Sequence, residues 1–355
     1  MTTSASPGEA RNALPANTFD DIHARLSAWA TATHPGSVVG EVARLAGNSG
    51  LSFSFELSRA GAPSERLVIR LAPPSVRRRG NTDVLRQVPL LRALEGANVP
   101  VARVRWAESE STWFGTDAVI QEFVDGRPLH LHDARLSVRG ERAEMETMVT
   151  RAIETLVAIH SLDWSTTLAS WSKVRGVQEE LAFWDGLRDR MAESQWSDRA
   201  HTFGEQLRIQ APEHVAVGLI HGDYQMNNVL FSAEHELLAV IDWELAGVGP
   251  QELDLGWFSV MTDPTCWHAD YSDILRLHLD PLMLVEIYEQ AGGLPVSRFN
   301  WWRALACFRF GVIAGFNLRL HRTGKRLDPL YEDLVPSVPV LFSRGLELLD
   351  SAECG

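Results

Sequence analysis

The feature that most constrains this chain is a polar stretch set between two apolar, strand-like runs. Residues 218–231 read GLIHGDYQMNNVLF, in which His221, Gly222, Asp223 and two asparagines interrupt the apolar pattern. A strand whose side chains only pack in a core would not contain so many polar residues in succession. The stretch therefore predicts a loop that carries function and is held between two strands.

A β-hairpin is predicted directly after this loop. Asn228 is followed by VLF, the turn-like SAEHE, LLAVI and Asp242. Antiparallel pairing centred on His235 makes opposed positions sum to about 470, which places Asn228 across from Asp242. Opposed side chains lie roughly 5 Å apart at Cβ, so an amide oxygen and a carboxylate could share one Mg²⁺ ion.

These residue types suit phosphoryl transfer, in which a protein mainly positions groups and neutralises charge. Asp223, at the mouth of the same hairpin, is the candidate catalytic base, and Asn228 and Asp242 are the candidate metal ligands. Gly222 would allow a tight turn beside the acid, and His221 would brace the loop by hydrogen bonding to nearby carbonyls.

Two further acids have more than one interpretation. Glu244 would share a strand face with Asp242, either as a surface acid or as a second partner of the metal. Asp254 begins an apolar helix, so we interpret it as a structural first-turn or capping acid.

Composition excludes several classes of protein. The formal net charge of -13 argues against nucleic-acid binding, which needs clustered Lys and Arg. Three widely separated cysteines indicate neither a disulfide framework nor a zinc site, and favour a cytoplasmic location. No apolar run is long enough for a membrane span. The oligomeric state stays open.

The order of the patterns predicts an α+β chain in two lobes. We expect a disordered tail at 1–17, a nucleotide-binding lobe at 18–124 and a helical lobe at 125–355 that carries the catalytic loop and the substrate pocket. The first lobe should contain a helix from Thr18, a three-stranded meander over 38–71, a helix over 82–95 and strands at 104–109 and 117–126. The second lobe should contain helices at 141–161, 177–193 and 198–210, strands within 215–243, and helix from 252 onward.

HGDYQMNN followed by VIDWE resembles the paired signature of the aminoglycoside phosphotransferase family, small-molecule kinases distantly similar to protein kinases. The resemblance begins near residue 38. It implies a bilobal protein-kinase-like fold with a small antiparallel sheet and one helix in the first lobe, and ATP or GTP with Mg²⁺ as cofactors. It gives Asp223 the role of base, Asn228 and Asp242 that of magnesium ligands, and Asp254 that of steadying the catalytic loop.

Two other stretches, IDWELAGVGPQELDLGW and LVIRLAPP, are similar to one branch of the family, the kinase domains of acyl-CoA dehydrogenase fusions. By the same resemblance Arg70 stands where kinases carry a phosphate-binding lysine. At the position where an acid is expected to pair with Arg70, this chain has Gln87, which would give a weaker contact than an ion pair. Pro89 also interrupts the helical pattern there. Glu95 is about two turns further on.

The rest of the nucleotide site also follows from the resemblance. AGNSGLSF, with Asn48, Ser49 and Gly50, resembles the phosphate-covering loop, although the same residues also form an ordinary hairpin turn. In DAVIQEFVDG, backbone atoms around 121–123 (Gln121, Glu122 and Phe123) would bind adenine.

The acceptor must be recognised by the helical lobe. Residues 298–326 contain seven Arg or Lys and no acid, which favours an anionic substrate unless these cations pair elsewhere or coat the surface. Arg309, in the most apolar helix, is the candidate for a substrate anion or a buried ion pair. Trp302 is a candidate for the substrate pocket, with core packing as the alternative.

We therefore predict an ATP- and Mg²⁺-dependent kinase of a small hydroxylated molecule. As the acceptor, we favour an unidentified hydroxylated acid, acyl-CoA or other metabolite slightly over an antibiotic such as an aminoglycoside. The alternative is a degenerate kinase-like protein that binds nucleotide or ligand without transfer. A protein kinase is disfavoured because IDWE replaces the Asp-Phe-Gly motif.

Overall fold

The structure, a computed structural model, describes residues 18–45, 51–73, 78, 82–109, 112–131 and 139–351. The expected tail at 1–17 and the loop residues Asn48, Ser49 and Gly50 lie outside the described residues. The chain forms two compact units. The first contains residues up to Glu95 together with Ala102–Val124, and the second contains Gly96–Val101 and everything from Asp125 onward.

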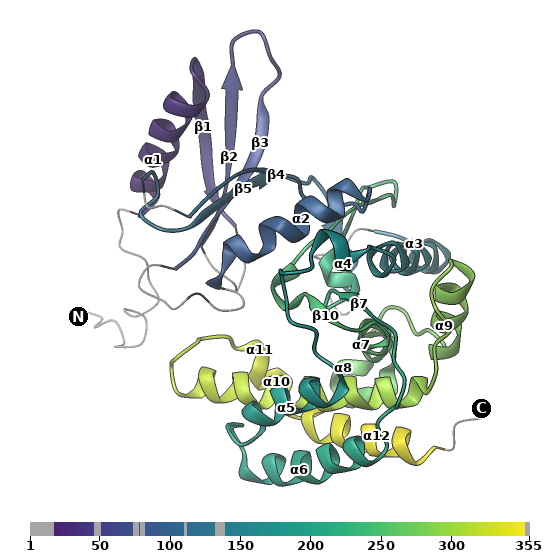
Figure 1. Cartoon of the computed structure of the whole chain (residues 1–355). Coiled ribbons are helices and arrows are strands. Elements are labelled where there is room, and N and C mark those ends of the chain that lie inside the picture. Colours follow the sequence, from purple (N-terminus) through teal and green to yellow (C-terminus); the bar gives the residue numbers. More distant parts are fainter. Residues whose placement is uncertain are drawn as a thin grey trace, which may run out of the picture. The chain divides into compact units, whose positions relative to one another are not determined.

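The first unit is built on one five-stranded antiparallel sheet (Figure 1). Its strand order is β1-β2-β3-β5-β4, so the expected meander over 38–71 is confirmed as three neighbouring strands. The bounds are β1 (Ser37–Arg44), β2 (Leu51–Arg59), β3 (Glu65–Leu71), β4 (Val104–Glu108) and β5 (Ala118–Glu122).

Side chains that alternate along the strands give this sheet two apolar faces. One face, with Phe53, Phe55 and Ile69 buried, packs against Leu26 and Trp29 of α1 (Thr18–Thr33). The helical spacing of the apolar residues predicted α1, and burial of this face explains why it forms.

On the other face of the sheet, Val119 and Ala72 pack with Val84 and Val88 of the segment around α2 (Gln87–Gly96). The helix expected over 82–95 is split, because a short 3-10 turn, η3 (Val84–Arg86), precedes α2. Pro89 therefore falls in the first turn of α2, where a backbone N–H has no partner within the helix and proline is tolerated.

Two short strand pairs position the polar loops of the second unit. Strands β7 (Val217–Ile220) and β10 (Gly247–Pro250) are antiparallel. Strands β8 (Val229–Phe231) and β9 (Leu237–Val240) form the expected hairpin, and β6 (Arg127–Pro128) pairs with β8. The rest of the described part of this unit is helical or irregular.

The helices of the second unit confirm the expected helical regions with shifted ends. The helix expected at 177–193 ends at Arg188, and the one expected at 198–210 begins at Ser194. The bounds are α3 (Arg142–His160), α4 (Trp164–Thr167), α5 (Val177–Arg188), α6 (Ser194–Ile209), α7 (Glu252–Thr262), α8 (Ala269–Ser272), α9 (Pro281–Gln290), α10 (Phe299–Arg322), α11 (Leu330–Asp333) and α12 (Ser337–Asp350).

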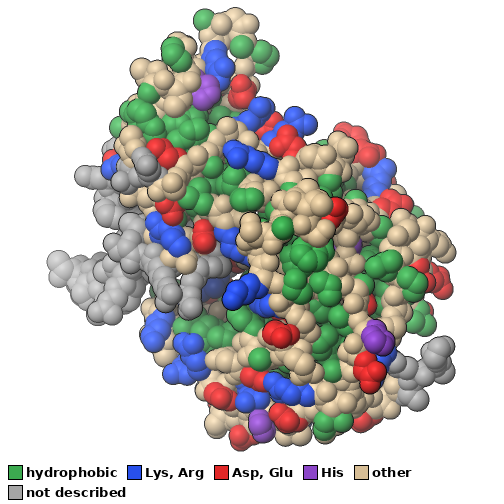
Figure 2. Space-filling view, in the orientation of Figure 1, with side chains coloured by type: hydrophobic (Ala, Val, Ile, Leu, Met, Phe, Trp, Pro, Cys, Tyr) green, Lys and Arg blue, Asp and Glu red, His purple; other side chains and the backbone are tan. Residues whose placement is uncertain are grey.

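Helix α10 organises the core of this unit, because it packs against α5, α6, α7 and α12. Most of its residues are buried, including Trp301, Leu305 and Phe308. Among the described residues no helix is long and apolar enough to cross a membrane. Acidic and basic side chains are interspersed over the face of the molecule seen in Figure 2, which is typical of a solvated surface. The mixture of antiparallel sheets and many helices confirms the α+β class.

Candidate active site

Two polar loops of the second unit meet at the ends of the short strands. The 221–228 loop joins β7 to β8, and the 241–246 loop joins β9 to β10. The backbone N–H of Ile241 donates to the carbonyl of Asn228 (2.9 Å), and Nε2 of His221 lies 2.9 Å from the carbonyl of Ile241. The chain is thereby folded so that the polar residues of both loops belong to one cluster.

The expected hairpin register is wrong by one residue. Val229 pairs with Val240, and the backbone of Asn228 therefore bonds to Ile241 rather than lying opposite Asp242. Phe231 pairs with Leu237, so the turn is centred on Glu234 rather than His235, and the register shift between Leu230 and Phe231 recovers only part of the difference.

The candidate metal ligands also lie outside the strands. Asn228 ends a 3-10 turn, η4 (Met226–Asn228). Asp242 has φ 65°, and this left-handed turn redirects the chain as β9 ends. Glu244 lies in the 3-10 turn η5 (Trp243–Leu245), so the expectation that it shares a strand face with Asp242 is wrong.

Three donors hold the carboxylate of Asp223. Nε1 of Trp257 and Nε2 of Gln225 each donate to Oδ1 (both 2.8 Å). Nδ2 of Asn228 donates to Oδ2 (3.1 Å) and also to the backbone carbonyl of Asp223 (2.9 Å). Asp223 as a whole residue is only half-buried, and its carboxylate is fixed in orientation by these donors.

The surroundings of Asp223 shift its acidity in opposing ways. Burial of the carboxyl group is the largest cause and raises its pKa, and the charge of Asp242 raises it further. The His221 imidazole and the hydrogen bonds from Trp257 and Asn228 lower it, but the net direction is upward. A carboxylate with a raised pKa is a stronger proton acceptor.

The donor set of the two loops fits a hard divalent cation. The amide nitrogen of Asn228 is engaged by Asp223, which leaves its amide oxygen as an electron donor. Asp242 and Asp223 carry like charges close enough to influence each other, and a cation would relieve that repulsion. Within the described ranges no cluster of three or more His, Cys, Asp or Glu could hold a metal, so an amide oxygen would have to contribute.

Asp254 holds the backbone of the 221–228 loop in place. It is completely buried in the first turn of α7, and its oxygens accept from the backbone N–H groups of His221 (2.7 Å) and Gly222 (2.8 Å). Nε2 of His160 lies 3.2 Å from the same carboxylate. Burial alone would raise the pKa of Asp254, but the hydrogen bonds and charge of His160 and His221 outweigh burial and lower it.

Gly222 is required by the geometry of the turn. Its φ is +82°, and a Cβ there would lie 2.5 Å from the backbone oxygen of Leu245. A side chain at this position would force the 221–228 and 241–246 loops apart.

Arg309 lies under the loop as part of a buried ion pair. It is 2% exposed, its Nη2 donates to the carbonyl of Gly222 (2.8 Å), and its Nε is 3.6 Å from Glu180. Its guanidinium also lies 4.8 Å from the ring centre of Trp257 and 5.0 Å from that of Trp184. Burial lowers the pKa of Arg309. Arg309 was expected to bind a substrate anion or to form a buried ion pair, and the structure contains the ion pair with Glu180.

The expectation that Trp302 lines a substrate pocket is wrong for the described structure. Trp302 is 1% exposed and packs in the core beside Trp301. Its backbone lies so close to Gly256 of α7 that a Cβ on Gly256 would be 2.7 Å away. At least three cations of the 298–326 segment are also paired, so its surplus positive charge is smaller than the sequence suggests. These pairs are Arg303 with Asp263, Arg309 with Glu180, and Arg322 with Glu193 and Glu332.

In the first unit, Arg70 and Gln87 are in contact. Nη1 of Arg70 donates to Oε1 of Gln87 (2.9 Å). Glu95 instead pairs with Arg103 (3.4 Å), so it does not replace the missing acid.

The segment expected to bind adenine has fewer free backbone donors than expected. The N–H of Glu122 donates to the carbonyl of Arg103 (2.9 Å), and that of Phe123 to the carbonyl of Arg66 (3.0 Å). The side-chain amide of Gln121 donates to the carbonyl of Ala102 (3.2 Å). These donors are used within the first unit.

Sequence reasoning missed Trp257, Gln225 and Glu180. Trp257 could have been found, because it lies three residues after Asp254 and residues at this spacing share a helix face. Glu180 could not, because nothing in a single sequence links it to Arg309.

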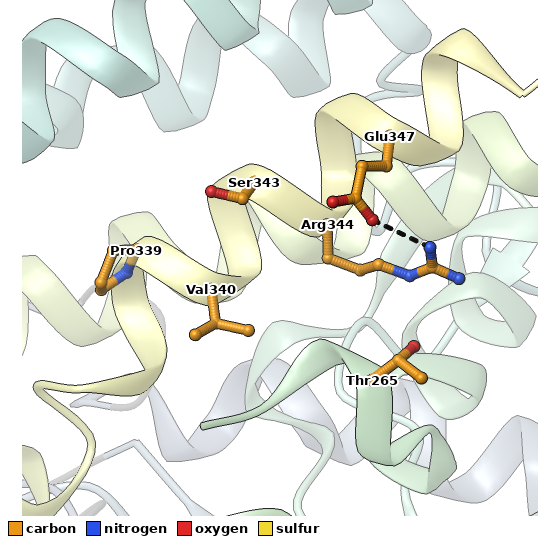
Figure 3. A pocket seen from close by; sticks show the side chains of 6 residues that line it. All are labelled: Thr265, Pro339, Val340, Ser343, Arg344 and Glu347. Atoms are coloured by element: carbon orange, nitrogen blue, oxygen red, sulfur yellow. Dashed lines mark hydrogen bonds and ion pairs between the residues drawn. The ribbon is translucent and has the colours of Figure 1, made fainter. Parts of the chain in front are cut away.

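A separate cavity of about 260 Å³ lies between α12 and the short turn η6 (Pro264–Cys266). In Figure 3 its wall includes Arg344 bonded to Glu347 (3.1 Å). It contains none of the residues discussed above. The lining residues are Thr265, Pro339, Val340, Ser343, Arg344 and Glu347.

Comparisons with known proteins identify the family of this chain. The model of the phosphotransferase enzyme family (APH) matches residues 43–279. The chain is 26% identical over 261 residues to acyl-CoA dehydrogenase family member 10 of Mus musculus, covering 70% of this chain and 24% of that protein. It is 29% identical over 313 residues to family member 11 of Gallus gallus, covering 83% and 39%. The chain thus spans well under half of these relatives.

Solved structures show the fold. A candidate aminoglycoside phosphotransferase from Ralstonia eutropha superposes with a TM-score of 0.74 at 22% identity, covering 93% of this chain and 98% of that one. Choline kinase LicA from Streptococcus pneumoniae superposes with a TM-score of 0.55 at 11% identity, covering 93% and 99%. The protein-kinase-like fold is therefore confirmed, and family and fold together indicate a small-molecule phosphotransferase. The family model spans most of the chain and includes both polar loops, so this protein belongs to the phosphotransferase enzyme family.

Proposed function

We propose that this protein transfers the γ-phosphate of ATP or GTP to a hydroxyl group of a small molecule, with Asp223 as the catalytic base. The observation that carries the proposal is the state of Asp223. Its carboxylate is oriented by three donors and has a raised pKa, and the residue as a whole is only half-buried. These are the properties needed to orient an attacking hydroxyl and accept its proton.

Magnesium would be held by Asn228 and Asp242. The fit rests on the amide oxygen of Asn228, whose amide nitrogen is engaged by Asp223, and on the neighbouring charges of Asp242 and Asp223. When bound, the ion would neutralise charge on the nucleotide phosphates.

The 221–228 loop is held rigid from two sides, which keeps the base in place during the reaction. Asp254 binds the backbone N–H groups of His221 and Gly222, and Arg309 binds the carbonyl of Gly222. Fixed positioning of this kind is the main contribution a protein makes to phosphoryl transfer.

The acceptor is proposed to be a hydroxylated metabolite, such as a hydroxylated acid or acyl-CoA, with an antibiotic as the second choice. The 298–326 segment supports an anionic acceptor, although three of its cations are paired within the protein. The names of the relatives and neighbours include both acyl-CoA dehydrogenase fusions and antibiotic kinases, so both classes belong in the assay.

The test is a coupled nucleotide-turnover assay with ATP, Mg²⁺ and a panel of hydroxylated acids, acyl-CoA thioesters and antibiotics, with products identified by the mass of an added phosphate. Asp223→Asn should abolish substrate-stimulated turnover. Asp189→Asn is the matched control, because the Asp189 side chain is 75% exposed and its carboxylate pairs with the neighbouring Arg188 at the surface. Full activity of Asp223→Asn, or no stimulation by any compound, counts against the proposal.

A degenerate binding protein is the second candidate, because Gln87 stands where an acid is expected opposite Arg70. Thermal-shift measurements with ATP, with and without Mg²⁺, separate the two candidates. Binding that is indifferent to metal, together with no phosphorylated product, would favour the degenerate protein.

A further inference from the structure

We infer that Gln225 is a positioning residue for the catalytic base. Its side chain and that of Trp257 together occupy Oδ1 of Asp223, which leaves Oδ2 as the oxygen that accepts the proton of the attacking hydroxyl. This inference rests on the proposed function and deepens it, because it assigns different roles to the two oxygens of one carboxylate.

The loop itself holds Gln225 beside the base. Gln225 lies two residues after Asp223 in an extended conformation, and its carbonyl accepts from the N–H of Asn228 (2.9 Å) at the start of η4. Tyr224, between the two, is buried, and its hydroxyl donates to the carbonyl of Ala152 in α3 (2.6 Å). With the backbone fixed in this way, Nε2 of Gln225 lies 2.8 Å from Oδ1 of Asp223.

Trp257 reaches the same oxygen from helix α7. Its Nε1 donates to Oδ1 of Asp223 (2.8 Å). The residue is buried, its ring centre lies 5.6 Å from that of Phe310, and the guanidinium of Arg309 lies 4.8 Å from the indole. These neighbours fix the indole, so its N–H is a stationary donor toward which the carboxylate is oriented.

The two donors use the hydrogen-bonding capacity of Oδ1. Each oxygen of an ionised carboxylate has two lone pairs and can only accept hydrogen bonds. Oδ1 accepts from both Trp257 and Gln225, whereas Oδ2 accepts from Nδ2 of Asn228 at the longer distance of 3.1 Å. Within the described ranges, one lone pair of Oδ2 is therefore left for the proton of a hydroxyl.

The position of Oδ2 also suits the proposed transfer. Its donor, Asn228, is the candidate metal ligand through its amide oxygen, so a hydroxyl at Oδ2 would be on the side of the nucleotide phosphates. The hydroxyl oxygen bonds to the γ-phosphorus as the bond from that phosphorus to the β,γ-bridging oxygen breaks. The hydroxyl proton passes to Oδ2, and the nucleoside diphosphate leaves with the electron pair of the broken bond.

The test measures kcat and KM with ATP, Mg²⁺ and the acceptor panel of the turnover assay, and with water when no acceptor is added. Gln225→Met keeps a similar volume but removes the donor. Its kcat should fall about tenfold, while KM for ATP changes less than about twofold. Gln225→Glu has the same shape but brings a second carboxylate against Oδ1, so its kcat should fall further.

A double variant, Gln225→Met with Trp257→Phe, tests whether the two donors share one function. Either donor alone still orients Oδ1, so the loss of both should lower kcat by more than the product of the two single losses. Gln195→Met is the matched control, because Gln195 is an exposed residue of α6, and it should keep the wild-type kcat. Thermal melting shows whether each variant is folded, and Gln225→Glu provides the test if Gln225→Met is unstable.

A wild-type kcat in both Gln225 variants would overturn this inference while leaving the proposed function intact. A raised KM for ATP with unchanged kcat would also overturn it, because it would assign Gln225 to nucleotide binding. A double variant whose loss only equals the product of the single losses would contradict the shared role at Oδ1. Absence of any ATP turnover by the wild-type protein would overturn the inference and the proposed function together.

Discussion

Replacement of Asp254 by Asn should destabilise the protein strongly, although only one oxygen is exchanged for an NH₂ group. The Asp254 carboxylate is completely buried and uses both oxygens. Oδ2 accepts from the N–H of His221 and Oδ1 from the N–H of Gly222. An Asn side chain has a single acceptor oxygen, so one backbone N–H would face an amide N–H instead.

The size of the effect follows from these contacts. A hydrogen bond to a charged group contributes about 1.5–3 kcal/mol, and an orphaned buried donor adds a desolvation cost of about 1–3 kcal/mol. His160, which also contacts Asp254, would lose its charged partner. We therefore expect the free energy of unfolding to fall by about 3–5 kcal/mol.

The assay is urea denaturation at neutral pH, with Asp280→Asn as the matched control. Asp280 is an exposed helix cap whose side chain accepts from the N–H of Leu282. Asn caps helices about as well as Asp, so this control should change stability by less than about 0.5 kcal/mol. A loss below about 1 kcal/mol in Asp254→Asn would refute the view that this carboxylate anchors the loop.

The same carboxylate predicts a dependence on pH. The folded-state pKa of Asp254 is lowered, so its contribution to stability is present above the unfolded-state pKa of about 3.9 and is lost as the pH falls through the folded value. Asp254→Asn should therefore lose less stability than the wild type on acidification, measured by urea midpoints at several pH values.

Two further substitutions test how the loop is positioned. Trp257→Phe keeps the ring but removes the N–H that donates to Asp223, so kcat should fall about tenfold or more while KM changes little; equal kcat values would contradict this. Gly222→Ala places a Cβ against the backbone oxygen of Leu245 at a φ of +82°, so thermal and urea unfolding should show a loss of about 2–5 kcal/mol. A loss within experimental error would mean that the two loops can separate freely.

Much of the fold could be predicted because its signals are local. Periodicity located α1, the meander, the hairpin and the long helices, since each depends on residues close together in sequence. Element ends were less accurate, as at Arg188, because helix ends depend on tertiary packing and capping.

The hairpin register shows the limit of local reasoning. Symmetric counting about His235 placed Asn228 opposite Asp242. The strand pair nearest the turn, Phe231 with Leu237, is instead centred on Glu234, and the shift between Leu230 and Phe231 makes up only half of this difference. Such irregularities depend on how the strands pack, so the residue pattern of the sequence does not predict them.

The sequence by itself determined which chemical groups make up the candidate site of this protein. They are an acid, an amide and a second acid on two loops beside one hairpin. Only the tertiary structure decided how these groups are held. Asp223 is oriented by Trp257 from a distant helix, and Arg309 is committed to Glu180 and the loop carbonyl rather than left open. The reason is that hydrogen bonds and ion pairs between distant segments depend on three-dimensional packing, which a local pattern does not encode.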